Sequence, residues 1–312
     1  MPPKNKTNLS AGIIITLIAY MFFAINSTLV RNVIHEIHTT EILFFQHFFS
    51  LLFIFPFAIR HGVKGLKTLY LPLHLVRDLT ALGSFFFYFS AIKYLNLIDA
   101  TVLSYTSPFF IPFVWRIWLK TKVRSEMWFT IIFGFIGIAL ILKPSMQFFQ
   151  VGTIIGIAAG VAAALSLVSI SILHQKHEST SKTLFYFFLV SSLVTFPFMS
   201  MNWTPPTPSM WYNLIGIGFS SAMGQLLLTY GYRFGTASYL SPLCYSIVIY
   251  ISIISWLVFN NPPGWLTFFG SLVVISGGSL SYILVKRPTG LKKLFTRNRM
   301  PPKIDPSKKT DL

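Results

Sequence analysis

Residues 11–30 read AGIIITLIAYMFFAINSTLV, and residues 152–173 read GTIIGIAAGVAAALSLVSISIL. Each run is apolar over about 20 residues, the length that an α-helix needs to cross the hydrocarbon core of a bilayer. Gly12 and Gly152 lie at the start of the two runs and are 140 residues apart. The two runs therefore predict an integral membrane protein with an internal repeat.

Apolar stretches of similar length follow one another along the whole chain, separated by short polar breaks with turn residues such as Pro205-Pro206. The predicted membrane helices are Ala11–Val30, Glu41–Ile59, His74–Tyr94, Ala100–Leu119, Met127–Leu142, Gly152–Leu173, Thr183–Met201, Trp211–Phe234, Ala237–Phe259 and Trp265–Val285. The sequence thus predicts an all-α integral membrane fold with ten transmembrane helices.

The composition agrees with this class of protein. Hydrophobic residues make up 54% of the 312 residues, and only 11% are charged. The mean hydropathy is +0.65. A soluble domain needs more polar surface than this, so the apolar excess is expected to face lipid. The formal net charge of +17 reflects Lys and Arg residues between the apolar runs and in the tail, which indicates membrane topology and no nucleic-acid partner.

The basic residues also predict the orientation. When successive breaks are assigned alternately to the two membrane faces, one face receives most of them: Lys4, Lys6, Arg60, Lys64, Lys67, Arg77, Arg116, Lys120, Lys122, Arg124, Lys176, Lys182, Arg233 and the tail. The other face holds only Arg31, Lys93 and Lys143. Positive charge accumulates on the cytoplasmic side, so we expect both termini in the cytoplasm and an even number of helices.

The repeat extends along both halves of the chain. A shift of 140 residues aligns Gly12 with Gly152, Ala19 with Ala159, Ala24 with Ala164, Thr40 with Thr180, Phe45 with Phe185, Phe48 with Phe188, Lys93 with Arg233, Tyr105 with Tyr245 and Gly137 with Gly277. Five helices per half is an odd number, so the second half is expected to be inverted, with the substrate site between the halves. We predict a cytoplasmic N-terminus at residues 1–10, one repeat at 11–144, a second at 151–285 and a basic cytoplasmic tail at 286–312.

Two motifs resemble a known family. Residues 87–108, FYFSAIKYLNLIDATVLSYTSP, and residues 133–144, FGFIGIALILKP, are similar to the EamA-type members of the drug/metabolite transporter superfamily. The second half carries weaker echoes at Tyr230–Phe234 and Ser276–Gly278. The resemblance implies a carrier that moves a small metabolite, such as an amino acid or a derivative, across the bacterial inner membrane by alternating access. An S-adenosylmethionine uptake or exchange carrier of the same family is the alternative.

Polar residues inside the predicted helices are the candidate substrate-binding residues, because a polar side chain in lipid indicates a lumen, a partner or a helix end. They are Tyr105, Tyr245, Gln46, His47, Tyr88, Asn26, Ser166, Gln225 and Tyr230. His47 is either a proton-coupling group or a hydrogen-bonded residue between helices. Tyr105 and Tyr245 each lie three residues from a proline, Pro108 and Pro242. Each proline leaves a backbone carbonyl without its helical hydrogen bond, and in a membrane only protein or water can supply a partner.

Two other features have competing interpretations. Arg77 and Asp78 are adjacent near the start of a predicted helix, so their side chains are expected to diverge by about 100° and not to pair. Arg77 then either reaches the membrane interface or attracts an anionic substrate group. Gly152, Gly156 and Gly160 form a stripe of small residues that allows close helix approach inside the bundle, or in a homodimer as the alternative.

Other function classes lack their motifs. The sequence contains no GxxxxGK[ST] phosphate loop, no HExxH and no GxSxG. Cys244 is the only cysteine, which excludes an intrachain disulfide and a thiolate metal cluster. We therefore expect no catalytic residues, no metal and no cofactor. A membrane-embedded enzyme or a channel remains the alternative from another class.

Overall fold

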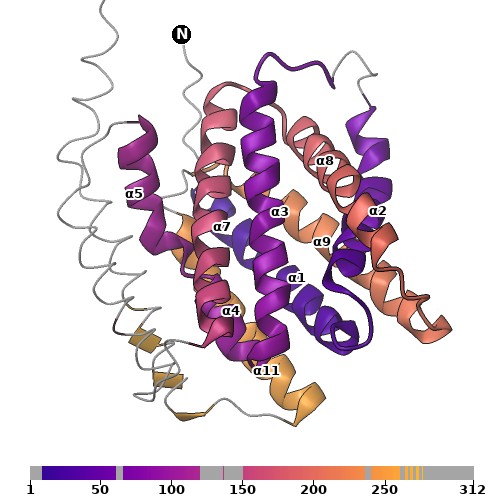
Figure 1. The fold of residues 1–312 in the computed structure, drawn as a ribbon. Helices are drawn as coiled ribbons and strands as arrows, with labels where there is room; N and C mark the ends of the chain where they lie inside the picture. Colours follow the sequence, from indigo (N-terminus) through magenta and orange to yellow (C-terminus); the bar gives the residue numbers. More distant parts are fainter. Residues whose placement is uncertain are drawn as a thin grey trace, which may run out of the picture.

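The protein is all-helical in the part of the chain that the structure describes, which in this computed structural model is residues 9–60, 66–119, 136, 150–235, 240–260, 264–265, 268–269, 272–273 and 276 (Figure 1). The elements are α1 (Leu9–Val33), α2 (Thr39–Ala58), α3 (Leu71–Tyr94), α4 (Leu97–Ser104), α5 (Ser107–Leu119), α7 (Val151–Gln175), α8 (Thr180–Met201), α9 (Pro208–Gly231), the 3₁₀ helix η3 (Ser241–Tyr245) and α11 (Ser246–Phe259).

Seven segments of the described residues are long and apolar enough to cross a membrane. Many large apolar side chains on these helices point outward, for example Phe57 at 59%, Ile154 at 58% and Leu193 at 65% exposed. An exposed apolar surface of this extent suits contact with lipid tails. The predicted spans Met127–Leu142 and Trp265–Val285 lie largely outside the described residues, so the count of ten helices stays a prediction.

The fourth predicted span, Ala100–Leu119, corresponds to an apolar segment of spanning length at Leu97–Trp118, but its helix is interrupted at Tyr105 between α4 and α5. The equivalent position in the second half is the 3₁₀ helix η3, which ends at Tyr245 before α11 begins. Pro108 and Pro242 explain both irregularities, because proline lacks the N–H that would continue an α-helical hydrogen-bond ladder. The two halves therefore share an interruption of regular α-helix at equivalent positions, Tyr105 and Tyr245.

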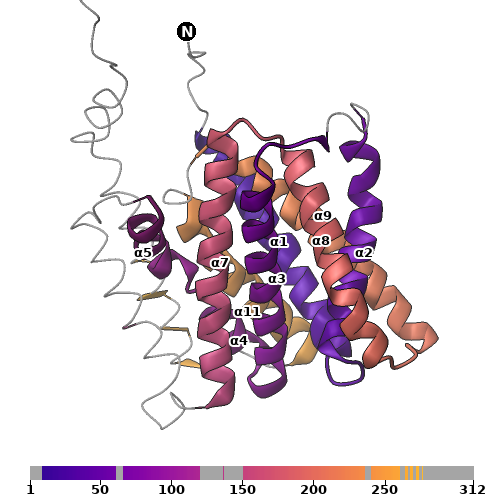
Figure 2. The same ribbon diagram turned by 45° about the horizontal axis from the view of Figure 1, so that its top comes forward.

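Helices from the two halves pack against each other reciprocally. The most extensive contacts join α3 to α7 and α1 to α9, so the first helix of each half packs on the third helix of the other. The two second helices, α2 and α8, also pack together. In Figures 1 and 2, α3 and α7 lie side by side, while α2 and α8 lie together to their right. This exchange is the pattern expected of two halves related by an internal pseudo-two-fold axis.

Glycines mark the closest points of this packing. A Cβ atom added to Gly12 would lie 2.8 Å from Phe234 Cβ, and one added to Gly152 would lie 2.8 Å from Tyr94 Cβ. Gly12 and Gly152 are equivalent in the repeat, and so are Tyr94 and Phe234. The same contact thus occurs twice. Gly12 on α1 meets Phe234, just after α9, and Gly152 on α7 meets Tyr94 at the end of α3.

The glycine stripe on α7 also faces the interior of the chain. Side chains added at Gly156 and Gly160 would meet Leu103 and Thr106, respectively. This stripe is therefore used for packing within the bundle, as one of its two interpretations predicts.

A polar cluster at one end of the bundle ties the segment before α3 to the start of α8. Glu178 accepts a hydrogen bond from Thr68 Oγ1 at 2.9 Å and pairs with Lys182 Nζ at 2.9 Å. His74 Nε2 lies 3.7 Å from the same carboxylate. Burial of Glu178 raises its pKa, but the bonds from Lys182 and Thr68 outweigh burial and hold the pKa below its usual range. The charged form of Glu178 therefore stabilises this end of the fold.

We predict that Gly160→Leu destabilises the protein by about 1–3 kcal/mol, the usual cost of overpacking. The first atom of the new side chain would overlap Thr106 Oγ1 and lie 3.3 Å from the Leu103 carbonyl oxygen. Gly83→Ala is the matched control, since a Cβ there meets nothing within 4 Å. Thermal unfolding in detergent measures both variants. An equal midpoint for Gly160→Leu and the wild type would contradict the α4–α7 packing.

We predict that Glu178→Gln lowers stability at pH 7 by roughly 1 kcal/mol. Because the pKa of Glu178 is lowered by folding, its contribution is fully present above about pH 4.3, the ordinary pKa of a glutamate, and is lost as the pH falls through the lowered value. Unfolding midpoints measured between pH 3 and 8 should therefore converge for wild type and variant at the acidic end. A difference that is constant over this range would show that the charge of Glu178 is not what matters.

Candidate functional site

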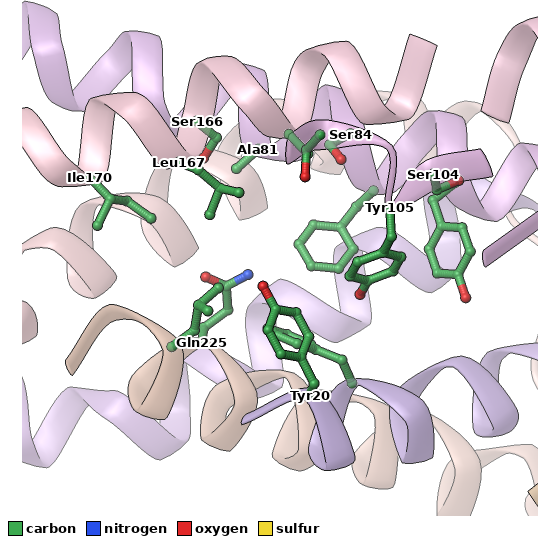
Figure 3. A pocket seen from close by; sticks show the side chains of 15 residues that line it. Tyr20, Ala81, Ser84, Ser104, Tyr105, Ser166, Leu167, Ile170 and Gln225 are labelled. Atoms are coloured by element: carbon green, nitrogen blue, oxygen red, sulfur yellow. The ribbon is translucent and has the colours of Figure 1, made fainter. Parts of the chain in front are cut away.

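A cavity lies where the helices of the two halves meet, with a volume of about 80 Å³ (Figure 3). Its wall is formed by α1, α3, α7, α9 and the break between α4 and α5. The lining residues are Tyr20, Phe23, Ala81, Ser84, Phe85, Tyr88, Ser104, Tyr105, Ser107, Ala163, Ser166, Leu167, Ile170, Gln225 and Leu228. Apolar and aromatic surface with a few polar groups is typical of a small-molecule site.

Three tyrosines form one end of the cavity. The Tyr105 ring stands edge-on to Tyr20, with centroids 6.0 Å apart, and edge-on to Tyr88, with centroids 6.1 Å apart. The Tyr88 hydroxyl shares a hydrogen bond of 2.8 Å with Thr101 Oγ1, which fixes its position. Tyrosines present both an aromatic face and a hydroxyl, so this end suits a cationic or aromatic part of a ligand.

A few amide and hydroxyl groups also line the cavity. In Figure 3, Gln225 and Tyr20 on one side face Ala81, Ser166 and Leu167 on the other. Ser84 Oγ donates to the Ala159 carbonyl at 3.0 Å and so links α3 to α7. The amide of Gln225 can both donate and accept a hydrogen bond.

The repeat relates several of these residues to one another. Phe85 and Gln225, Tyr88 and Leu228, and Phe23 and Ala163 are equivalent pairs, and both members of each pair line the cavity. A site lined by equivalent residues lies at the junction of the two halves. This position agrees with the expectation drawn from the repeat.

The structure divides the predicted site residues into separate groups. Tyr88, Tyr105, Ser166 and Gln225 line the cavity together. Tyr230 lies apart at the end of α9, where it is 41% exposed and packs on Phe234.

Asn26 and Gln46 belong to a buried network beside the cavity wall. Asn26 Nδ2 donates to the Ile217 carbonyl at 2.9 Å, to Gln46 Oε1 at 3.2 Å and to Ser220 Oγ at 3.3 Å. This network joins α1 and α2 to α9. Neither residue is among those that line the cavity.

His47 is fully buried on α2 and is not among the residues that line the cavity. Its Nδ1 is 2.7 Å from the Leu43 carbonyl oxygen one turn earlier. The ring stands edge-on to Phe187 at 5.1 Å and to Phe85 at 6.0 Å. These surroundings are those of a histidine packed between helices.

Sequence reasoning missed Tyr20 and Ser84 as cavity residues. Tyr20 is a phenol in the middle of the first apolar run, which is the signal that could have identified it. Ser84 carries no such signal, because serines in membrane helices more often bond to their own backbone.

The expectation that Arg77 and Asp78 do not pair is wrong, and so is the first of the two interpretations of Arg77, in which it reaches the membrane interface. Both side chains are 0% exposed, and Arg77 Nη1 lies 3.4 Å from Asp78 Oδ1. Arg77 Nη2 also donates to Gln225 Oε1 at 3.1 Å. The long arginine side chain spans the angle between adjacent helical positions, and burial favours any available counter-charge.

We predict that the equivalent tyrosines differ in their effect on stability. Tyr245 is 2% exposed and stacks on Phe109 with centroids 6.1 Å apart, so Tyr245→Ala should cost about 3 kcal/mol or more. Tyr105→Ala should cost clearly less, because the half-buried Tyr105 borders the cavity. Unfolding midpoints of both variants test this difference, and equal losses would contradict it.

Comparisons with known proteins agree with the fold and the repeat. The sequence profile of the EamA-like transporter family matches residues 10–143 and again residues 150–283, the same 140-residue separation found within the chain. A solved protein structure with 15% sequence identity superimposes with a TM-score of 0.69, covering 90% of this chain and 99% of that chain. This likeness supports the fold alone.

Curated relatives are named as transporters. A pseudopaline exporter of Pseudomonas aeruginosa is 28% identical over 86% of this chain and 94% of its own length. An S-adenosylmethionine uptake transporter of Rickettsia bellii is 26% identical over 85% of this chain and 91% of its own length. A riboflavin transporter of Vibrio cholerae is 26% identical over 85% and 91%. With the double profile match and the helical bundle, these relatives show that the chain belongs to the EamA-like transporter family.

Proposed function

We propose that the protein is a secondary carrier that moves a small metabolite, an amino acid or a derivative of one, across the bacterial inner membrane by alternating access. The observation that carries the proposal is the cavity at the junction of the halves, lined by equivalent residues and by Tyr20, Tyr88, Tyr105 and Gln225. Ten helices in two inverted repeats with cytoplasmic termini complete the proposal. The basic residues of the sequence support this orientation.

The size of the cavity supports a cycle of opening and closing. Its volume of about 80 Å³ is well below the roughly 300–1,000 Å³ of usual small-molecule sites. A metabolite would therefore bind only after the halves move apart. The reciprocal α1–α9 and α3–α7 contacts are the surfaces along which such a movement would occur.

S-adenosylmethionine uptake or exchange is the second candidate within this class. It is favoured by the named Rickettsia relative and by the tyrosine cluster, because aromatic faces attract cations such as a sulfonium. The pseudopaline and riboflavin relatives match to a similar extent, so overall similarity does not choose among these cargos.

The packing of His47 supports a structural role in this carrier. Its ring packs against Phe85, Phe187 and Phe188, and His47 is not among the residues that line the cavity. We predict that His47→Gln leaves the pH dependence of substrate uptake into proteoliposomes unchanged. Loss of that dependence in the variant would instead assign proton coupling to His47.

We predict that Ala163→Trp lowers substrate exchange at least tenfold, because Ala163 lines a cavity with little spare volume. Val161→Trp on the same helix is the matched control, since Val161 is 37% exposed and is not among the residues that line the cavity. The measurement is counterflow in proteoliposomes with labelled amino acids, S-adenosylmethionine and riboflavin. Equal exchange by both variants would remove the cavity from the transport path, and uncoupled conductance or chemical turnover would indicate a channel or an enzyme.

A further inference from the structure

A pair of opposite charges is buried beside the cavity. Arg77 and Asp78 are both 0% exposed, and Arg77 lies about 9 Å along the axis of α3 from the start of that helix. Charged side chains at such depth are costly in a membrane and usually mark a substrate or ion path. The packing of the bundle alone does not account for this pair.

The two charges are only partly satisfied by each other. Their distance of 3.4 Å is longer than the 2.7–2.9 Å of a strong charge-assisted hydrogen bond. Arg77 also lies over the Phe187 ring, 3.9 Å from its centroid. Arg77 Nε and Asp78 Oδ2 are buried and have no hydrogen-bond partner among the described residues. A guanidinium has five N–H donors, so both charges retain capacity for another ligand.

The pair is connected to the cavity in two ways. Arg77 shares a face of α3 with Ala81 and Tyr88, four and eleven residues later, and both of these line the cavity. Gln225 lines the cavity as well, and its Oε1 accepts a hydrogen bond of 3.1 Å from Arg77 Nη2. Gln225 is therefore the contact between the cavity and the charges.

The pair occurs in one half of the repeat only. The equivalent positions in α9 are Ile217 and Gly218, and a Cβ added at Gly218 would overlap Phe49. The second half thus reaches the same packing without charges at these positions. A feature that the repeated fold does not require is a candidate for a role in recognition.

We infer that Arg77 and Asp78 form a recognition site for the zwitterionic head of an α-amino acid. The ligand carboxylate displaces Gln225 Oε1 and accepts hydrogen bonds from the Arg77 guanidinium, whose planar fork matches a carboxylate. The ligand ammonium donates to Asp78 Oδ2. The remainder of the ligand extends toward Tyr20, Tyr88 and Tyr105. This inference rests on the proposed carrier function and specifies the chemical class of its substrate.

The first test uses wild-type protein in proteoliposomes and therefore does not depend on the folding of a variant. The labelled probes are the twenty amino acids, S-adenosylmethionine and riboflavin, which lacks an α-amino carboxylate. Competing ligands are the methyl ester of each exchanged amino acid and decarboxylated S-adenosylmethionine. We expect at least one zwitterion to exchange and its neutralised or decarboxylated analogue to compete at least tenfold less well.

The second test is the double variant Arg77→Met with Asp78→Leu. Replacing both members of a buried ion pair with apolar residues is often neutral or stabilising, so the unfolding midpoint should be kept. Exchange of the zwitterion should fall at least tenfold. Arg233→Met is the matched control, because Arg233 is an exposed arginine beside Tyr230 and lies apart from the cavity, and it should exchange the zwitterion as the wild type does.

The outcomes separate the inference from the proposed function. Wild-type exchange of a zwitterion by the double variant, or equal competition by the methyl ester, would overturn the Arg77–Asp78 site and leave the carrier intact. Exchange of riboflavin without any zwitterion would do the same. A wild-type protein that exchanges none of the probes would overturn the carrier proposal and the inference with it.

Discussion

The fold depends on the close packing of the first helix of each half against the third helix of the other. Lipid tails are as apolar as leucine side chains, so the hydrophobic effect does little to hold membrane helices together, and close approach of backbones matters more. Gly12 and Gly152 provide this approach at equivalent places in the two seams. The cavity lies between these seams, so its walls come from both halves.

The break at Tyr105 gives the cavity its irregular end. An interrupted helix at membrane depth is tolerated where its backbone is buried in protein or faces water. Here the break lies against Tyr20 and Tyr88, and Cys244 Sγ is 3.6 Å from the Tyr105 carbonyl oxygen. The equivalent Tyr245 is instead packed on Phe109. The two equivalent tyrosines have thus diverged, Tyr105 toward the cavity and Tyr245 toward packing.

The buried polar residues of the bundle fall into groups with different partners. Asn26 and Gln46 join three helices, His47 is packed among phenylalanines, and Glu178 holds one end of the bundle. Arg77 and Asp78 differ from these groups because they are a fully buried pair of opposite charges, and Arg77 is hydrogen-bonded to Gln225, which lines the cavity. Buried charge in contact with the cavity distinguishes this candidate recognition site from the structural polar groups.

The sequence by itself determined the class of protein, the position of most membrane helices and the 140-residue repeat, because apolar run length and spacing are local properties that lipid imposes on the chain. It also identified Tyr88, Tyr105, Ser166 and Gln225 as candidates. Only the tertiary structure decided that Tyr20 joins them, that Tyr230 and Tyr245 do not, and that Arg77 turns inward to Asp78 and Gln225. The reason is physical: which face of a helix meets a cavity, a neighbour or lipid depends on how distant segments pack, and spacing along one helix does not contain that information.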